Sequence, residues 1–432
     1  EQIDALLAEG EADDALLERG VALATQSKLW EAALRFARRA AERTERGPAH
    51  AAALMRVVEI VRDAMGDREG ALVEARKAHE AYPGDLTALR ALHDLSPAGD
   101  RGRDARRTVD AIREAVRAEG VSIERVVGLT EAARLGGDGV LERLSRRLGA
   151  VLGADGAPML LAPSRGSLRD PALVLRYRHP DDNGRAVALL EAVLPDLAEL
   201  SGATTDALRV GWTEKVRGAH PTRAALGALL RAAGCEDFEL YMGGAEAGRI
   251  AAVAGDPVTV VVGAGVSTPL DAAARFELVR RLLLALRGAA ALAHDAPTAV
   301  AERCLAALAC AELPVATPAS RYEAHVKAVG KAMSRKTRKA IAESGRSLAA
   351  DPNAWDELVN AARAVLSTAR RGALAVSGDV AAAARDLSAA LGQRDRSAKE
   401  ALTADAAGRE LALYAVSDAL AQVVRDLGTD PQ

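Results

Sequence analysis

Two trios of alanines, 38 residues apart, constrain the fold of this chain more than any other feature. Each trio has helical spacing, within the segments LWEAALRFARRAAE and GDREGALVEARKAHEAYP. The alanines are Ala33, Ala37, Ala40, Ala71, Ala75 and Ala78. Such small residues let two helices approach closely, and Pro83 ends the second segment. Because one helix pair cannot bury its own apolar face, repeated pairs must stack on their neighbours.

The surrounding sequence predicts four helix pairs. They are residues 14–26 with 29–42, 49–64 with 66–83, 85–95 with 103–118, and 123–135 with 139–152. The pattern resembles the tetratricopeptide repeat (TPR), whose period is about 34 residues, and the insertion RTERGPAH accounts for the longer spacing. The resemblance implies an α-solenoid over residues 1–152. It also implies a concave groove for a protein or peptide partner, lined by helices starting near Asp14, Ala49 and Asp85.

Composition and charge narrow the class of protein. Aromatic residues make up only 3% of the chain, and the abundance of Ala, Leu and Arg predicts a mainly α fold. The net charge of −3 provides no overall basic footprint, so nucleic acid is not an expected partner. No apolar stretch is long enough to span a bilayer. Three scattered cysteines favour a reducing compartment, and we expect the cytoplasm.

The ends and middle of the chain carry boundary signals. It opens at Glu1 inside a helical pattern, which indicates a truncated N-terminus and leaves open a signal ahead of it. Gly, Pro and Ser cluster at 153–170, which predicts a linker. The remainder, 171–432, is expected to be a helix-rich α+β domain with a small sheet. Its strands are predicted at 173–177, 238–242, 249–253 and 258–263, and its helices at 184–200, at 222–233 and from 272 onward.

One glycine-rich turn offers an enzymatic alternative. The segment VTVVVGAGVS places Gly263 and Gly265 directly after an apolar strand. It resembles the start of a dinucleotide-binding loop and the opening motif of sirtuins, in which glycines let a phosphate approach the backbone. Thr268 stands where the third glycine of that loop would be. NAD binding at Gly263–Gly265 is therefore an alternative to a purely structural turn.

The order of elements in the second half resembles HExxH zinc peptidases of the CAAX-protease and heat-shock-peptidase type. The resemblance extends over roughly residues 208–428, and TPR-containing proteins of myxobacteria share this arrangement. On the helix after the last strand, Arg280, Arg281 and Leu284 occupy the positions of the first His, the Glu and the second His. On a later helix, Val365 and Ala369 occupy the positions of the ligand Glu and the Asp. Arginine donates hydrogen bonds and cannot bind a cation, so the resemblance implies a pseudopeptidase without zinc.

A single basic run offers another surface. Within KAVGKAMSRKTRKA, the candidate contact residues are Lys331, Arg335, Lys336, Arg338 and Lys339. Such a cluster suits a solvated face or interdomain salt bridges, or else contact with a phosphate, an acidic partner or an anionic membrane. No aromatic residue interleaves it for base stacking. The seven histidines are scattered and no GxSxG motif occurs.

These features lead to one functional expectation and two alternatives. We expect a non-catalytic scaffold for protein–protein interaction, with no cofactor, metal or catalytic residue, and leave its oligomeric state open. The first alternative is an enzyme, either a divergent metallopeptidase or an NAD-dependent activity at Gly263–Gly265. The second is an acidic-partner or nucleic-acid binder acting through Lys331–Lys339.

Overall fold

The computed structural model describes residues 14–154 and 166–428. These residues are mainly helical, with one small three-stranded sheet, as the composition predicted. The chain divides into two compact units, Glu1–Gly149 and Ala150–Gln432, and the division falls inside a helix. The helical pattern expected at the extreme N-terminus and most of the expected linker lie outside the described residues.

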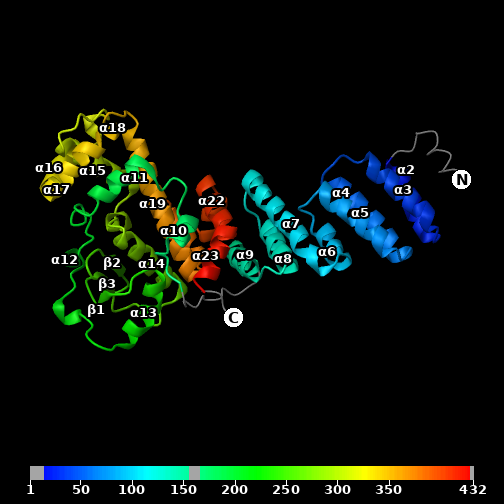
Figure 1. Ribbon diagram of the computed structural model, residues 1–432, viewed down its shortest axis with the longest axis horizontal. Helices are drawn as coiled ribbons and strands as arrows, with labels where there is room; N and C mark the ends of the chain where they lie inside the picture. Colours follow the sequence, from blue (N-terminus) through cyan, green and yellow to red (C-terminus); the bar gives the residue numbers. More distant parts are fainter. Residues whose placement is uncertain (1–13, 155–165, 429–432) are drawn as a thin grey trace. The chain divides into compact units, whose positions relative to one another are not determined.

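The first unit is a succession of helices (Figure 1). They are α2 (Asp14–Gln26), α3 (Trp30–Arg43), α4 (Pro48–Glu59) with a π-helical extension (Ile60–Ala64), α5 (Arg68–Ala81), α6 (Leu86–Leu95), α7 (Ala98–Glu119), α8 (Ile123–Leu135) and α9 (Gly139–Leu152). From α2 to α8 each helix packs on the next, and α4 also packs on α6, and α6 on α8. The alternate helices α4, α6 and α8 therefore form one layer, and the ion pair Arg56–Glu18 joins α2 to it.

The alanine trios occupy the tight contacts of this unit. Ala33 and Ala37 of α3, and all three alanines of α5, are buried, whereas Ala40 is only half-buried. The helix starts are set by side-chain caps: Asp67 accepts from the N–H of Gly70, and Asp85 from that of Thr87. Burial of small residues thus holds each pair together, as the spacing predicted.

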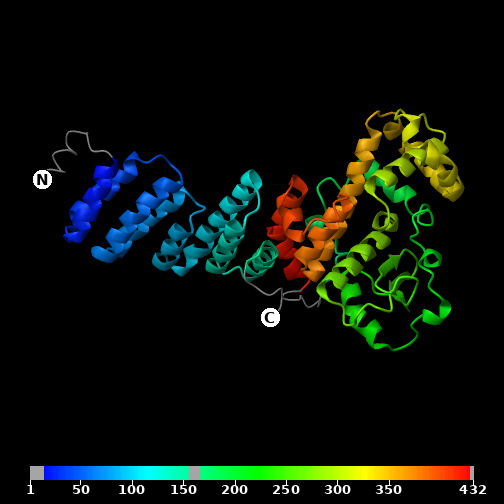
Figure 2. The same ribbon diagram turned by 180° about the vertical axis from the view of Figure 1, so that it is seen from behind.

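The second unit contains the sheet. Its strands are β1 (Phe238–Met242), β2 (Ile250–Val253) and β3 (Val258–Val262), in the order β1-β3-β2. The central strand β3 runs parallel to β1 and antiparallel to β2. One long helix, α14 (Ala272–Leu286), packs on β2 and β3 (Figure 2). Asp271 caps this helix by accepting from the N–H of Ala274 at 2.7 Å.

The helix α19 (Ala354–Ser377) packs on α14, α15 and α11, and the unit contains further helices. They are α10 (Pro171–Tyr177), α11 (Gly184–Val193), α12 (Thr205–Leu208), α13 (Pro221–Ala232), α15 (Pro297–Cys310), α16 (Glu323–Ala332), α17 (Arg335–Ser344), α18 (Arg346–Ala349), α20 (Val380–Ala390), α21 (Ala398–Thr403), α22 (Ala406–Ala415) and α23 (Asp418–Asp426). Gly378, in the left-handed region at φ 68°, ends α19 and lets the chain turn into α20.

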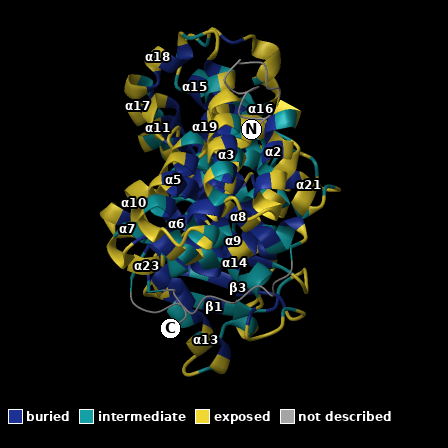
Figure 3. Cartoon of the chain, turned by 90° about the vertical axis from the view of Figure 1, so that its right-hand side faces the viewer, coloured by how far each residue is buried: buried dark blue, intermediate teal, exposed yellow. Residues whose placement is uncertain are grey.

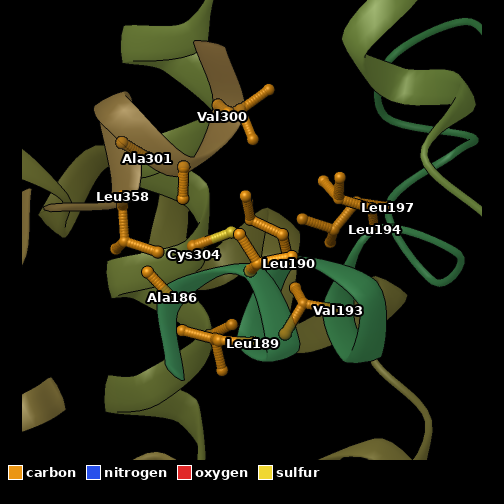
Figure 4. Packing of buried hydrophobic residues seen from close by; sticks show 14 of the residues in the cluster. Ala186, Leu189, Leu190, Val193, Leu194, Leu197, Val300, Ala301, Cys304 and Leu358 are labelled. Carbon is orange, nitrogen blue, oxygen red and sulfur yellow. The ribbon is translucent and has the colours of Figure 1, made fainter. Parts of the chain in front are cut away.

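Burial differs strongly between these helices (Figure 3). In α16 and α17 most residues are exposed or half-buried, and only Val329 and Ile341 are buried. The main core instead joins α11, α15 and α19, where Leu190, Cys304 and Leu358 lie against one another (Figure 4). Cys304 therefore packs as a small apolar residue.

One predicted strand and the end of one predicted helix are wrong. Residues 173–177 form the greater part of helix α10, not a strand. Pro171 stands at the first helical position, and the Asp170 side chain accepts from the N–H of Ala172 at 2.9 Å. This start signal outweighs the β-favouring composition of LVLRY, because proline and an aspartate cap together preorganise a helical first turn. Likewise, the helix expected at 184–200 ends at Val193, two residues before Pro195.

Candidate functional site

The five peptidase-like positions separate onto two sides of the α14–α19 contact. Leu284, Val365 and Ala369 are buried in the main core and line a cavity of about 320 Å³. None of these apolar side chains can ligate a metal ion. Arg280 and Arg281 line a different and larger cavity of about 670 Å³. The structure therefore brings three of the positions together and places the two arginines elsewhere.

The arginines belong to an ion-pair cluster that joins three helices. Arg280 of α14 lies 2.9 Å from the carboxylate of Glu277 and 3.0 Å from that of Asp386 on α20. Asp386 also accepts from Nε of Arg370 on α19, at 2.9 Å. Arg281 pairs with the same Glu277. Three arginines thus share two carboxylates, so the cluster carries an excess positive charge.

Burial and the ion pairs act in opposite directions on the charges of this cluster. Burial lowers the pKa of Arg280, but Asp386 and Glu277 outweigh this effect and raise it. For Glu277 the directions are reversed. Burial alone would raise the pKa of this carboxylate, but Arg280 and Arg281 bring it below its ordinary value. Arg280 and Glu277 therefore stay ionised at neutral pH. Because Arg280 and Arg370 are only 6% and 3% exposed, their charges are weakly screened.

The 670 Å³ cavity lies between α14, the start of α15, and α20 with the loop that follows it. Arg385 and Arg394 also line it, and both side chains are exposed. Neither makes an ion pair within residues 14–154 and 166–428. The carboxylates of the wall are Glu277, Asp295 and Asp386. Asp295 is held at 2.5 Å by Arg303 from outside the wall.

His294 lines the same cavity and is uncharged at neutral pH. Burial, followed by the neighbouring Arg281 and Arg249, lowers its pKa to about 4. Nη2 of Arg249 lies 3.2 Å from Nδ1 of His294. Since a guanidinium can only donate, Nδ1 accepts this bond, and the proton of the neutral ring resides on Nε2. The histidine therefore adds a neutral donor to an arginine-rich wall.

The glycine-rich turn has a structural reason for its glycines. A Cβ on Gly263 would lie 2.3 Å from the carbonyl oxygen of Ala247 and 2.6 Å from that of Glu246. The N–H groups of Gly263 and Gly265 donate to the carbonyls of Arg249 and Ala247, at 2.8 and 2.7 Å. The neighbouring segment therefore occupies both the space and the donors that a phosphate would need.

The five residues of the basic run lie on α16 and α17, and all but one of their side chains are exposed. Lys331, Arg335, Lys336 and Lys339 are exposed and make no ion pair within the described parts of the chain. Arg338 is half-buried and donates to the carbonyl of Gly330. Ser334 caps α17, and its own N–H donates to Asp196 at 2.7 Å. Four of the five basic side chains are therefore exposed to solvent.

The layer formed by α2, α4, α6 and α8 carries ion pairs between successive members. Arg56 of α4 lies 3.2 Å from Glu18 of α2. Arg90 of α6 makes a two-point contact with Glu131 of α8, at 2.6 and 2.5 Å. Larger apolar side chains are also exposed on the layer, at Leu23 and Val127. The face is therefore mainly polar and bears both signs of charge.

Two further observations concern metals and membranes. In the described ranges 14–154 and 166–428, no group of three His, Cys, Asp or Glu side chains is arranged to hold a metal ion. In the same ranges, no helix has the length and apolarity needed to cross a bilayer.

Most of the cavity was not apparent from the sequence. The sequence indicates Arg280 and Arg281 for another reason, and His294 with Asp295 equally as an oriented base or as a helix end and turn. Asp386, Arg385 and Arg394 carry no local motif, because ion pairs between distant helices leave no periodic signal. The only sequence signal for this cavity is the frequency of arginines in the helical second half of the chain.

Comparison with known proteins provides no relative for this chain. No protein-family model matches it, and no curated protein or solved structure is significantly similar to it.

Proposed function

We propose that this chain is a non-catalytic binding protein, in which the layer of α2, α4, α6 and α8 holds a peptide segment of a protein partner. The observation that carries this proposal is the packing order of the first unit, in which helices contact their sequence neighbours and alternate helices form one layer. Arrays of this kind expose an extended face whose residues are free to vary without disturbing the core. TPR-like repeats would provide this architecture.

The chemistry of the face suggests what the partner segment offers. Ion pairs at Arg56–Glu18 and Arg90–Glu131 present charged groups that an incoming peptide can share. Leu23 and Val127 are about half exposed, at 47% and 48%, and provide apolar contact points. A segment with both charges and a few aliphatic side chains fits this surface best.

A role without catalysis also fits the second unit. If this unit descends from a zinc peptidase, core packing at Leu284, Val365 and Ala369 has replaced the ligands. Zinc hydrolysis needs three donors and an open position for water. The unit would then serve as a folded platform. The NAD-dependent alternative is less well supported, because backbone of residues 246–249 fills the Gly263 turn.

A peptide-display selection against the full chain tests the proposal. Selected peptides should bind the wild-type protein. Arg90→Glu should weaken peptide binding at least about tenfold, because the new carboxylate repels Glu131 and the two-point contact between residues 90 and 131 is lost. Arg39→Glu on α3 is the matched control, because Arg39 also pairs with a carboxylate and is equally exposed, at 53% against 54% for Arg90. Equal losses in both variants, or none in either, would contradict the assignment of the face.

A second candidate function rests on α16 and α17. Their exposed cations lie in a chain whose net charge is −3, so the positive charge is concentrated locally. Such a patch suits an acidic segment of a partner protein. A poly-glutamate peptide should bind in a salt-dependent manner and be weakened by Lys336→Glu, whereas Lys399→Glu on α21 should have no effect. Binding that survives Lys336→Glu would exclude this surface.

A further inference from the structure

The arginine-lined cavity contains more positive charge than its carboxylates neutralise. Seven arginines either line this cavity or bind a residue that lines it. Together they have only four carboxylate partners. The arginines are Arg249, Arg280, Arg281, Arg303, Arg370, Arg385 and Arg394. The carboxylates are Glu246, Glu277, Asp295 and Asp386. Each excess charge in a partly buried site costs free energy unless an anion compensates it.

The excess is located at identifiable donors. Nη1 of Arg281 is buried and has no hydrogen-bond partner among the described residues, although the rest of this guanidinium pairs with Glu277. Arg385 and Arg394 have no carboxylate partner in those same ranges. A buried donor without a partner is rare in a folded protein, because it forfeits its bonds to water. All three residues line one cavity, where a ligand would meet Arg385 and Arg394 directly and the buried Nη1 of Arg281 after a shift of that side chain.

Two further features of the wall favour an anion. Ala296 and Pro297 begin α15, a helix of 14 residues whose first turn has no side-chain cap. The positive dipole end of such a helix attracts negative charge. The ring proton of His294 adds a neutral donor, since Nδ1 already accepts from Arg249. Cavity walls of this composition repel cations.

We propose that this cavity binds a small organic phosphate, held by Arg281, Arg385 and Arg394. The volume of about 670 Å³ lies within the range of ligand sites and exceeds what an inorganic ion needs. Guanidinium forks match phosphate oxygens in two-point contacts. A phosphate ester carries close to two charges, whereas a single carboxylate carries one and would leave most of the excess uncompensated.

Isothermal titration of the full chain with inorganic pyrophosphate tests this proposal. Wild-type protein should bind one equivalent, and the affinity should fall as sodium chloride is raised. The double substitution Arg385→Gln with Arg394→Gln should weaken binding at least tenfold, because each charge-assisted contact contributes roughly a factor of ten. Both side chains are exposed, so circular dichroism should show an unchanged fold.

The matched control is Arg231→Gln with Arg209→Gln, which removes two positive charges from the same unit. Neither residue lines the cavity. This variant should bind pyrophosphate within about twofold of wild type. Equal loss in both variants would show attraction by net charge alone, and retention of affinity without Arg385 and Arg394 would place the anion elsewhere. Either result overturns the assignment.

A parallel titration separates phosphate from carboxylate. Citrate carries three carboxylates and a similar charge, so it should bind at least about tenfold more weakly than pyrophosphate if phosphate geometry is what the guanidinium groups recognise. Equal or tighter binding of citrate would overturn the proposed ligand class. The absence of any heat with either probe, together with an unchanged melting temperature at millimolar concentrations, would overturn the site itself.

Discussion

Removing the shared carboxylate of Asp386 should destabilise the second unit strongly. Asp386 accepts from Arg280 and Arg370 at 3.0 and 2.9 Å, and their side chains are only 7% and 4% exposed. In Asp386→Ala, Arg280 keeps Glu277, but Arg370 keeps only the hydroxyl of Ser367 at 3.3 Å. A nearly buried guanidinium would then lack a counter-charge. Breaking a buried pair from one side costs about 3–5 kcal/mol, which is the expected loss in free energy of unfolding.

Urea unfolding followed by tryptophan fluorescence measures this loss. Trp30 lies in the first unit, whereas Trp212 and Trp355 lie in the second, so a Trp30→Phe background reports on the second unit alone. Adding Arg370→Met to Asp386→Ala should recover about 2 kcal/mol, because the stranded charge is removed as well. Asp395→Ala, at an exposed carboxylate, should change stability by less than about 0.5 kcal/mol.

A loss below about 1 kcal/mol in Asp386→Ala would refute the reasoning. The reasoning would also be refuted if Asp386→Ala with Arg370→Met were no more stable than Asp386→Ala alone. The expected recovery of stability depends on the unpaired charge of Arg370 being the cause of the loss.

Three further predictions follow from local geometry. The pKa of His294 in the folded chain, about 4, lies below its ordinary 6.5. As the pH falls, the unfolded chain therefore binds this proton before the folded chain does. The free energy of unfolding should decrease by up to about 3 kcal/mol between pH 6.5 and pH 4, and His294→Gln should not show this decrease. Gly263→Ala should lower the melting temperature and cost about 2 kcal/mol, because its Cβ would meet the Ala247 carbonyl at 2.3 Å; an unchanged melting curve would contradict this. Lys336→Glu, in the first turn of α17, should stabilise the protein by about 0.3–1 kcal/mol through the helix dipole, and a decrease in chemical-denaturation midpoint would oppose it.

The sequence predicted the local elements better than their contacts. The bounds of α2, α8 and α9 and of β1 coincide with the residues expected, because each has a strong period or a clear start and end. The strand prediction for residues 173–177 is wrong because four apolar and aromatic residues were given more weight than the helix start at Pro171. A proline preceded by aspartate deserved more weight in so short a segment.

The candidate site illustrates the opposite limit. Arg280 could be placed on a helix from its neighbours, but nothing near it in sequence indicates that its partner is Asp386 on a distant helix. Arg338 looked like its exposed neighbours and instead turns towards the carbonyl of Gly330. Such outcomes depend on which helices meet, and that information lies in the packing of the whole unit rather than in any local window.

The central helix α19 has a consequence for how this chain can evolve. In its first half, exposed positions such as Asp356, Asn360 and Arg363 recur every three or four residues. From Ala364 to Ser377 only Ser367 and Arg371 are even partly exposed. A scan of all single substitutions should therefore show a periodic pattern of tolerance that disappears halfway along one helix. Beyond that point, change would require compensating substitutions in neighbouring helices, so this half should be the slowest part of the chain to diverge.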